Sequence, residues 1–251
     1  MIEVEDLQKR HDDREILRGI SFRIPSHSVA AVVGPSGGGK TTLLRCMHGL
    51  APFDGGRVRI GDAELRPGSQ ASQRAALDAV RRKAGFVFQT WHLFAHMTVL
   101  ENVIEAPVHV RKIARAAAIE KAEALLEKVG LSHRKGALPS SLSGGEQQRA
   151  AIARALAMEP EVLFMDEPTS ALDPERVVLL CELLATLRDE GLTLVAVTHD
   201  IGFAERLADR VLVLAGGELA ESGPPAEVLT HPRDPRTARF LGVAPPADEE
   251  E

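Results

Sequence analysis

The spacing of apolar residues divides the chain into a strand-rich start, a helical middle and a strand–helix alternation toward the end. Residues 1–33 alternate polar and apolar side chains, and this period of two predicts a small, half-exposed antiparallel sheet. Residues 28–33 are a continuous apolar run ahead of Gly34, which predicts a buried parallel strand. A helix is predicted over residues 41–50, and residues 57–60 resemble an edge strand.

Helical periodicity dominates the middle of the chain. A surface helix is predicted over residues 68–83, and a short strand over residues 86–88 leads to Gln89. Three helices follow, over residues 99–110, 115–129 and 144–158. Buried strands over residues 162–165, 192–197 and 211–214 then alternate with helices over 174–190 and 201–208. Alternation on both sides of the helical stretch predicts a doubly wound α/β core.

Composition narrows the classes of function. The chain has 251 residues and a formal net charge of −6, which argues against a nucleic-acid binder because such proteins usually carry a basic face. No apolar run approaches the roughly 18–20 residues that cross a bilayer, so we expect the chain to stay in the cytosol. Its two cysteines, Cys46 and Cys181, form neither a metal-ligand cluster nor a disulfide framework.

A glycine-rich segment over residues 34–41 joins the predicted strand at 28–33 to the helix that follows it. Its sequence, GPSGGGKT, matches the phosphate-binding pattern G-x-x-x-x-G-K-[ST]. Glycines let backbone N–H groups close around phosphate oxygens, and the helix N-terminus adds positive potential. Lys40 is expected to reach the β- and γ-phosphates, and Thr41 to offer its hydroxyl to Mg²⁺.

Polar residues follow three of the predicted strands. Asp166 and Glu167 end the strand at 162–165, where Asp166 is predicted to hold Mg²⁺ and Glu167 to orient or deprotonate an attacking water. The amide of Gln89 can ligate Mg²⁺ or that water, and His199 follows the next buried strand beside the expected γ-phosphate. Taken alone, Gln89 is more often a solvated strand end, and a lone histidine is more often structural.

A second candidate phosphate site lies at residues 142–149, LSGGEQQR. Ser143 can cap the helix that follows, with Glu146 three residues later, so a well-capped helix start is one interpretation. The other is an anion site, because exposed N–H groups and a hydroxyl at a helix N-terminus bind anions. In a compact domain the two phosphate sites need not face each other, so this one can serve a nucleotide held by another copy of the chain.

Taken in order, these elements resemble the nucleotide-binding subunit of an ABC transporter. The chain carries a Walker A loop, a Q-loop glutamine, the LSGGE signature, a Walker B strand with its glutamate, a D-loop at residues 170–173 and a switch histidine. The resemblance covers residues 1–243. It implies an α/β P-loop NTPase core with a mostly parallel sheet over residues 1–89 and 159–243, which includes an N-terminal antiparallel β subdomain. It also implies an inserted helical signature subdomain over 90–158, and an acidic disordered tail is expected at 244–251.

The resemblance implies ATP and Mg²⁺ as ligands and a head-to-tail homodimer. Glu167, His199 and Gln89 are the implied catalytic residues, and Thr41, Gln89 and Asp166 the implied metal ligands. The implied ATP-binding residues are His11, Gly34, Pro35, Ser36, Gly37, Gly38, Gly39, Lys40, Thr41, Thr42, Ser143, Gly144, Gly145 and Glu146. The family usually stacks an aromatic residue on adenine near residue 11, where this chain has His11. Imidazole can stack more weakly, or Arg10 can cover the base, so we expect somewhat weaker ATP affinity.

Two further segments, residues 88–103 and 231–241, resemble the ATPase subunits of bacterial importers for polar amino acids. This finer resemblance implies permease subunits in the membrane, an extracytoplasmic solute-binding protein as an indirect partner, and a peripheral position on the cytoplasmic face of the bacterial inner membrane. An ATPase for efflux or lipoprotein release would share the catalytic residues and stays an alternative. A DNA-repair or chromosome-structural ATPase would need a coiled-coil insertion between Gln89 and Leu142, for which this chain has no room.

Overall fold

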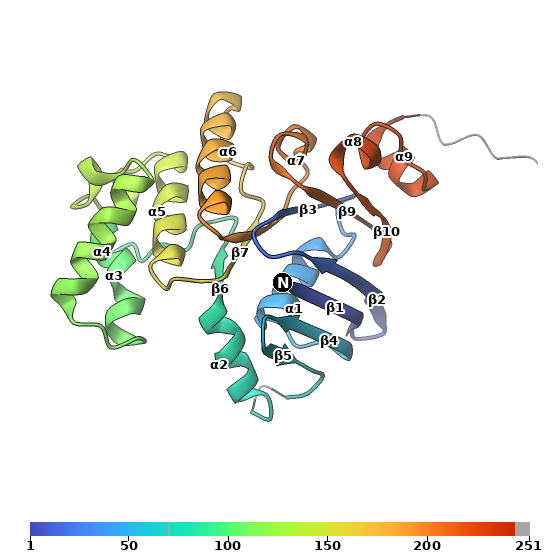
Figure 1. Cartoon of the computed structure of the whole chain (residues 1–251), viewed down its shortest axis with the longest axis horizontal. Helices are drawn as coiled ribbons and strands as arrows, with labels where there is room; N and C mark the ends of the chain where they lie inside the picture. The colour runs from blue at the N-terminus through green and yellow to red at the C-terminus, as the bar shows by residue number, and fades with distance from the viewer. Residues whose placement is uncertain (70, 244–251) are drawn as a thin grey trace, which may run out of the picture.

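Two β-sheets and a lobe of helices make up the molecule. The structure is a computed structural model and describes residues 1–69 and 71–243. The acidic segment 244–251, for which we expected disorder, lies outside the described residues. Figure 1 shows the two sheets at one side and the helical lobe at the other.

The smaller sheet is antiparallel, as the alternating pattern predicts. It contains β1 (Ile2–His11), β2 (Arg14–Ile24), β4 (Gly55–Ile60) and β5 (Ala63–Leu65), in the order β2-β1-β4-β5. The prediction of an edge strand at residues 57–60 was wrong, because β4 pairs with β1 on one side and with β5 on the other. The three-residue strand β5 takes the edge position.

The larger sheet carries the candidate chemistry at its strand ends. Its members are β3 (Val29–Val33), β6 (Ala84–Val87), β7 (Val162–Asp166), β8 (Thr193–Val197), β9 (Arg210–Ala215) and β10 (Glu218–Gly223). The order is β10-β9-β3-β8-β7-β6, and all pairs are parallel except β10 with β9. Strands β3, β7 and β8 are buried along their whole length. This mostly parallel sheet confirms the predicted α/β class.

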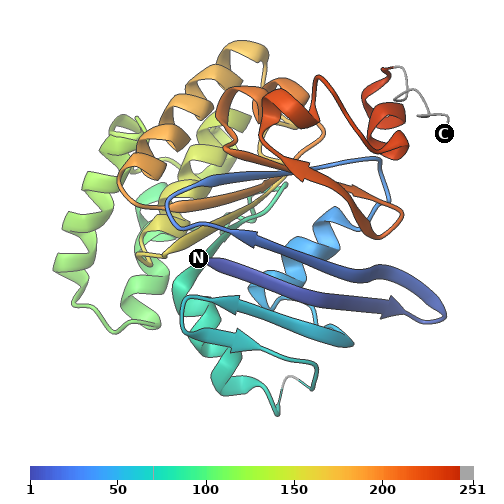
Figure 2. The same cartoon turned by 45° about the vertical axis from the view of Figure 1, so that its right-hand side comes forward.

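Helix α1 (Lys40–His48) lies between the two sheets, where Leu43, Leu44 and Met47 are almost fully buried (Figures 1 and 2). On the opposite face of the larger sheet lie α6 (Pro174–Asp189) and α7 (Ile201–Leu207). Helix α2 (Arg74–Lys83) is shorter than predicted, because Pro67 and Gly68 delay its start. The short helices α8 (Pro225–Val228) and α9 (Pro235–Leu241) follow β10.

The helical lobe consists of α3 (Val99–His109), α4 (Arg115–Lys128) and α5 (Gly144–Leu156), with 3₁₀ turns at Ser132–Arg134 and Pro139–Ser141. Thr98 with Glu101, and Ser143 with Glu146, form capping boxes that start α3 and α5. One apolar cluster joins this lobe to α6 and to the larger sheet. In the described part of the chain, no helix has the length and apolar character needed to span a membrane.

Candidate nucleotide site

The glycine-rich loop lies between β3 and α1 and has a backbone that only glycine fits. Gly34 has a φ of 137°, and a Cβ built there would lie 2.1 Å from the carbonyl oxygen of Leu214 on β9. Gly39, the residue that caps α1, is left-handed with a φ of 94°. No side chain caps α1, so its first N–H groups face the loop without a side-chain acceptor.

Lys40 is held by the same loop that it completes. Its Nζ donates to the carbonyl oxygens of Gly34, at 2.8 Å, and Pro35, at 3.0 Å. Burial lowers the pKa of this ammonium, and the nearby charges of Glu167 and Asp166 oppose that shift. An ammonium that is short of solvation is well placed to accept an anionic ligand as a partner.

Asp166 ends β7 directly opposite the start of α1. Its Oδ1 accepts a hydrogen bond of 2.8 Å from the hydroxyl of Thr41, and Arg45 approaches its Oδ2 at 4.0 Å. The carboxyl side chain is only 5% exposed. A hydroxyl and a carboxylate are oxygen ligands of the kind that Mg²⁺ prefers, usually completed by water and substrate phosphates. This donor set therefore fits a magnesium ion bound together with a nucleotide.

Glu167 and His199 meet at the ends of adjacent strands β7 and β8. Glu167 has a left-handed φ of 50°, and its N–H donates to the carbonyl of Val197. Its Oε2 lies 2.8 Å from His199 Nδ1 and accepts from the His199 N–H at 3.3 Å. The Glu167 side chain is 15% exposed, whereas that of His199 is 65% exposed. The carboxylate is thus desolvated, and the imidazole holds it at the mouth of the site.

An open cleft of about 440 Å³ brings several of the predicted residues together. This volume is within the usual range for small-molecule sites. The cleft is lined by Arg14, Ile16, Ser36, Gly37, Gly38, Gly39, Lys40, Thr41, Thr42, Gln89 and Glu167. Gly34 and Pro35 lie behind it as acceptors for Lys40, and Asp166 lies behind Thr41. The phosphate-binding loop, Gln89 and Glu167 therefore share one cavity.

The base side of the cleft differs from the sequence-based expectation. His11 does not line the cavity; it is exposed, and its Nδ1 lies 3.1 Å from Asp12 Oδ2. Arg14 and Ile16, on the other strand of the same hairpin, line it instead. Sequence reasoning missed both residues. The strand register pairs His11 with Arg14 across the turn, so a hairpin at this turn would have indicated Arg14, whereas no such signal indicates Ile16.

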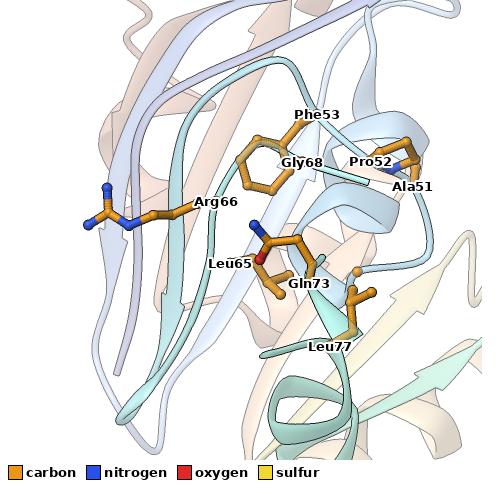
Figure 3. A pocket seen from close by; sticks show the side chains of 9 residues that line it. Ala51, Pro52, Phe53, Leu65, Arg66, Gly68, Gln73 and Leu77 are labelled. Carbon is orange, nitrogen blue, oxygen red and sulfur yellow. The ribbon is translucent and has the colours of Figure 1, made fainter. Parts of the chain in front are cut away.

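A second hollow lies outside this site. It is an apolar pocket between the end of α1, β5 and α2, walled by Ala51, Phe53, Leu65 and Leu77 (Figure 3). Its interior holds only about 20 Å³, which is room for a single water. It contains none of the residues predicted to carry chemistry, so the cleft over Lys40 is the better candidate for a functional site.

The signature segment lies apart from the cleft of its own chain. Ser143 caps α5, where its Oγ accepts from Glu146 N–H, and Glu146 Oε2 accepts from Ser143 N–H at 2.8 Å. This backbone hydrogen bond and the guanidinium of Arg134 lower the pKa of Glu146 to about 2. Gly144 and Gly145 form the first residues of the helix. None of these four residues lines the cavity that contains Lys40.

Helix α1 begins after Gly39 and lies beside β7, which ends at Asp166 and is followed by Glu167. Within a mostly parallel sheet, this arrangement defines a P-loop nucleoside triphosphatase. A model of the ABC transporter family matches residues 17–170. The chain belongs to this family, which confirms the predicted resemblance, and it hydrolyses ATP.

Similarity to known proteins extends over nearly the whole chain. The chain is 46% identical to the arginine/ornithine transport ATP-binding protein AotP of Pseudomonas aeruginosa, covering 96% of this chain and 97% of that protein. It is 47% identical to the arginine transport ATP-binding protein ArtM of Bacillus subtilis, covering 96% and 98%. The fold matches the dimeric post-hydrolysis structure of the ATP-binding cassette MJ0796 bound to ADP and Pi, with a TM-score of 0.79, 31% identity and coverage of 90% and 99%.

Proposed function

We propose that this chain hydrolyses ATP to energise the import of a small polar solute, an amino acid, with a cationic amino acid such as arginine as the first candidate. The main support is the similarity, over nearly the full length, to ATP-binding proteins named for arginine transport. The cleft that joins Lys40, Gln89 and Glu167 supplies the site for ATP. The chain itself holds no solute site in this proposal, because selectivity belongs to its partners.

In the proposed ATP complex, Lys40 leaves the carbonyls of Gly34 and Pro35 and binds the β- and γ-phosphates. The glycine-rich loop and the N-terminus of α1 surround the phosphates with N–H groups. Thr41, Asp166 and Gln89 are the proposed ligands of Mg²⁺, which would neutralise phosphate charge. Ser36 and Thr42 line the same cleft and are proposed to contact the phosphates.

Glu167 is the proposed base for hydrolysis. A water oxygen attacks the γ-phosphorus, its proton passes to the Glu167 carboxylate, and the bond to the ADP oxygen breaks. His199 holds Glu167 through the contact of 2.8 Å and presents its exposed ring edge to the γ-phosphate. Gln89, which follows the neighbouring strand β6 and lines the same cleft, is proposed to orient this water.

Two copies are proposed to pair head to tail, so that Ser143, Gly144 and Gly145 of one chain, with Glu146 behind them, complete the ATP site of the other. Their absence from the cleft of their own chain and the dimeric form of the related cassette support this arrangement. Permease subunits, and indirectly an extracytoplasmic solute-binding protein, complete the proposed importer on the cytoplasmic face of the inner membrane.

Reconstitution in liposomes tests this proposal. The chain is combined with its permease and binding protein, and uptake of radiolabelled arginine is measured with ATP on the side of the chain. We expect uptake with wild-type protein and none with Glu167→Gln. A panel of other amino acids tests the solute class. Transport of solute from the ATP side of the membrane to the binding-protein side would overturn the import proposal in favour of efflux or lipoprotein release. ATP turnover that no amino acid stimulates would do the same.

A further inference from the structure

The segment that follows Gln89 is fastened to α5 by the half-buried cation of Arg154. Arg154 donates from Nη1 to the carbonyl oxygen of His92 at 2.6 Å and from Nη2 to that of Trp91 at 2.7 Å. No carboxylate pairs with Arg154 among residues 1–69 and 71–243, and burial lowers the pKa of its guanidinium. Two backbone carbonyls, together with the Phe94 ring whose centroid lies 6.0 Å from Arg154 Cζ, therefore compensate a partly desolvated charge.

The backbone of this segment is shaped for that contact. Trp91 and His92 are both left-handed, with φ values of 57° and 47°, although neither is glycine. Such conformations cost free energy and persist only where the surroundings stabilise them. Here the two successive left-handed residues turn adjacent carbonyls toward one guanidinium, so Arg154 stabilises a conformation that the loop would not favour alone.

A second contact fastens the same segment to the start of α5. The Cη2 atom of the Trp91 ring lies 3.4 Å from the position that a Cβ on Gly144 would take. The ring therefore packs against the first residue of the signature helix, next to Ser143. Figure 1 shows the segment after β6 passing beside α5, so main chain and side chain hold the loop at two places along this helix.

We propose that Trp91 and Arg154 are positioning residues that make the segment after Gln89 and the signature helix move as one unit. When the γ-phosphate or its water draws Gln89 inward, this clamp carries α5 with it and moves Ser143 toward the partner chain. The inference rests on the proposed roles of Gln89 and Ser143, and it adds the two residues that connect them.

Trp91 is the single tryptophan of the chain, so its fluorescence reports directly on the clamp. We propose to titrate full-length protein with MgATP in a Glu167→Gln background and to follow both nucleotide binding and Trp91 emission. ATP turnover is measured in parallel with Glu167 intact, for Arg154→Lys, Arg154→Met and the control Arg111→Lys. Arg111 also donates to a backbone carbonyl, that of Met158, and it pairs with Glu159; within residues 1–69 and 71–243 it makes no hydrogen bond to Trp91 or His92.

We expect Arg154→Met to keep the Kd for ATP within about twofold, while kcat falls by about tenfold or more, because both charge-assisted hydrogen bonds to the segment are lost. The Hill coefficient for ATP should fall toward one, and the ATP-dependent change in Trp91 emission should disappear. Arg154→Lys should be intermediate, because a point charge cannot bridge two carbonyls as a planar guanidinium does. Arg111→Lys should match wild type.

Wild-type kcat, Hill coefficient and emission change in a folded Arg154→Met protein would overturn the clamp. Should Arg154→Met fail to fold, the same three readouts on Arg154→Lys decide the question. Failure of the wild-type chain to bind or hydrolyse ATP would overturn the proposed site, and the inference with it. If only the clamp proposal is wrong, the wild-type chain still binds and hydrolyses ATP, so the two failures are distinguishable.

Discussion

Helices α1 and α5 both begin with glycine-rich segments that present N–H groups to a possible phosphate, yet they are capped in opposite ways. Gly39 precedes α1, no side chain caps it, and its first turn holds no acidic residue. Ser143 and Glu146 form a capping box on α5, and Glu146 lies in its first turn. The first helix therefore needs an anion to satisfy its backbone, whereas the second satisfies part of its own N-terminus with side chains.

This difference predicts an order of binding. The bare N-terminus of α1 gains most from a phosphate and also carries Lys40, so it should bind ATP in a single chain. The capped N-terminus of α5 can add only a hydroxyl and spare N–H groups, and the nearby Glu146 carboxylate repels an anion. It should engage ATP already held by a partner, as the second and weaker contact of a composite site.

The largest expected effect is on the rate of hydrolysis at the site beside α1, with ATP binding unchanged. Glu167→Gln keeps the size of the side chain but cannot accept a proton at neutral pH. We expect kcat to fall about 10²–10⁴-fold with little change in the affinity for ATP, measured by phosphate release and equilibrium binding. Glu175→Gln, in the first turn of α6, is a matched control that should retain wild-type turnover. Undiminished hydrolysis by Glu167→Gln would rule out the role given to this carboxylate.

The next effect tests the anion site of α1 itself. Lys40→Met removes the ammonium that we expect to leave the carbonyls of Gly34 and Pro35 for the phosphates. Loss of a hydrogen bond to a charged group costs about 1.5–3 kcal/mol, so ATP affinity should fall about 10–100-fold. Stability should change little, because no carboxylate loses a direct partner. Lys83→Met, which breaks only the contacts with Asp62 and Glu161, is the control and should bind ATP normally.

The parts of this candidate site can be recognised in the sequence because each of them is local. An apolar run followed by charge places Asp166 at a strand end, and the helix start after Gly39 can be seen within a few residues. The sheet order could not be obtained in this way, since the positions of β4 and β5 depend on pairing between distant segments. The contact of Arg154 with Trp91 joins residues 63 positions apart, and no local pattern marks it. Strand β10 escaped prediction because it is only half-buried and lacks an apolar run.

A third prediction concerns whether α5 contacts the nucleotide of its own chain or the nucleotide of the partner chain. In dimers isolated with two different tags, Lys40→Met and Ser143→Ala are placed either on the same chain or on different chains. If the signature completes the partner's site, the same-chain arrangement damages both sites, and the split arrangement leaves one site intact. We expect the split dimer to hydrolyse ATP about tenfold faster than the same-chain dimer, the change that the loss of one charge-assisted hydrogen bond would cause. The reverse ranking would show that each signature serves its own chain.

A fourth effect concerns the capping of α5 and is seen in acid. Hydrogen bonds from Ser143 and Arg134 lower the pKa of Glu146 to about 2 in the folded chain. Because the folded pKa is depressed, the stabilisation is complete above the unfolded pKa of about 4.3 and is lost as pH falls toward 2. Glu146→Gln should lower the free energy of unfolding by about 1 kcal/mol at pH 6, in the range of helix caps and dipole effects. The free energies of unfolding of the two proteins, measured with denaturant between pH 6 and pH 3, should converge as the pH falls. A difference that stays constant with pH would contradict the assignment.

The smallest effect concerns the base side of the site at α1. Arg14 lines the cleft and His11 does not, so a guanidinium over the adenine face should replace much of the aromatic stacking that the family resemblance implies. Arg14→Ala should weaken ATP binding about fivefold, consistent with a cation–π contact of about 1 kcal/mol, while His11→Ala should change it less. Arg18→Ala, an exposed residue further along β2, is the control. Inorganic triphosphate has no base for Arg14 to contact, so Arg14→Ala should weaken the binding of inorganic triphosphate less than the binding of ATP. An equal loss for both ligands would place Arg14 on the phosphates rather than on the base, and a larger loss in His11→Ala would restore histidine as the stacking residue.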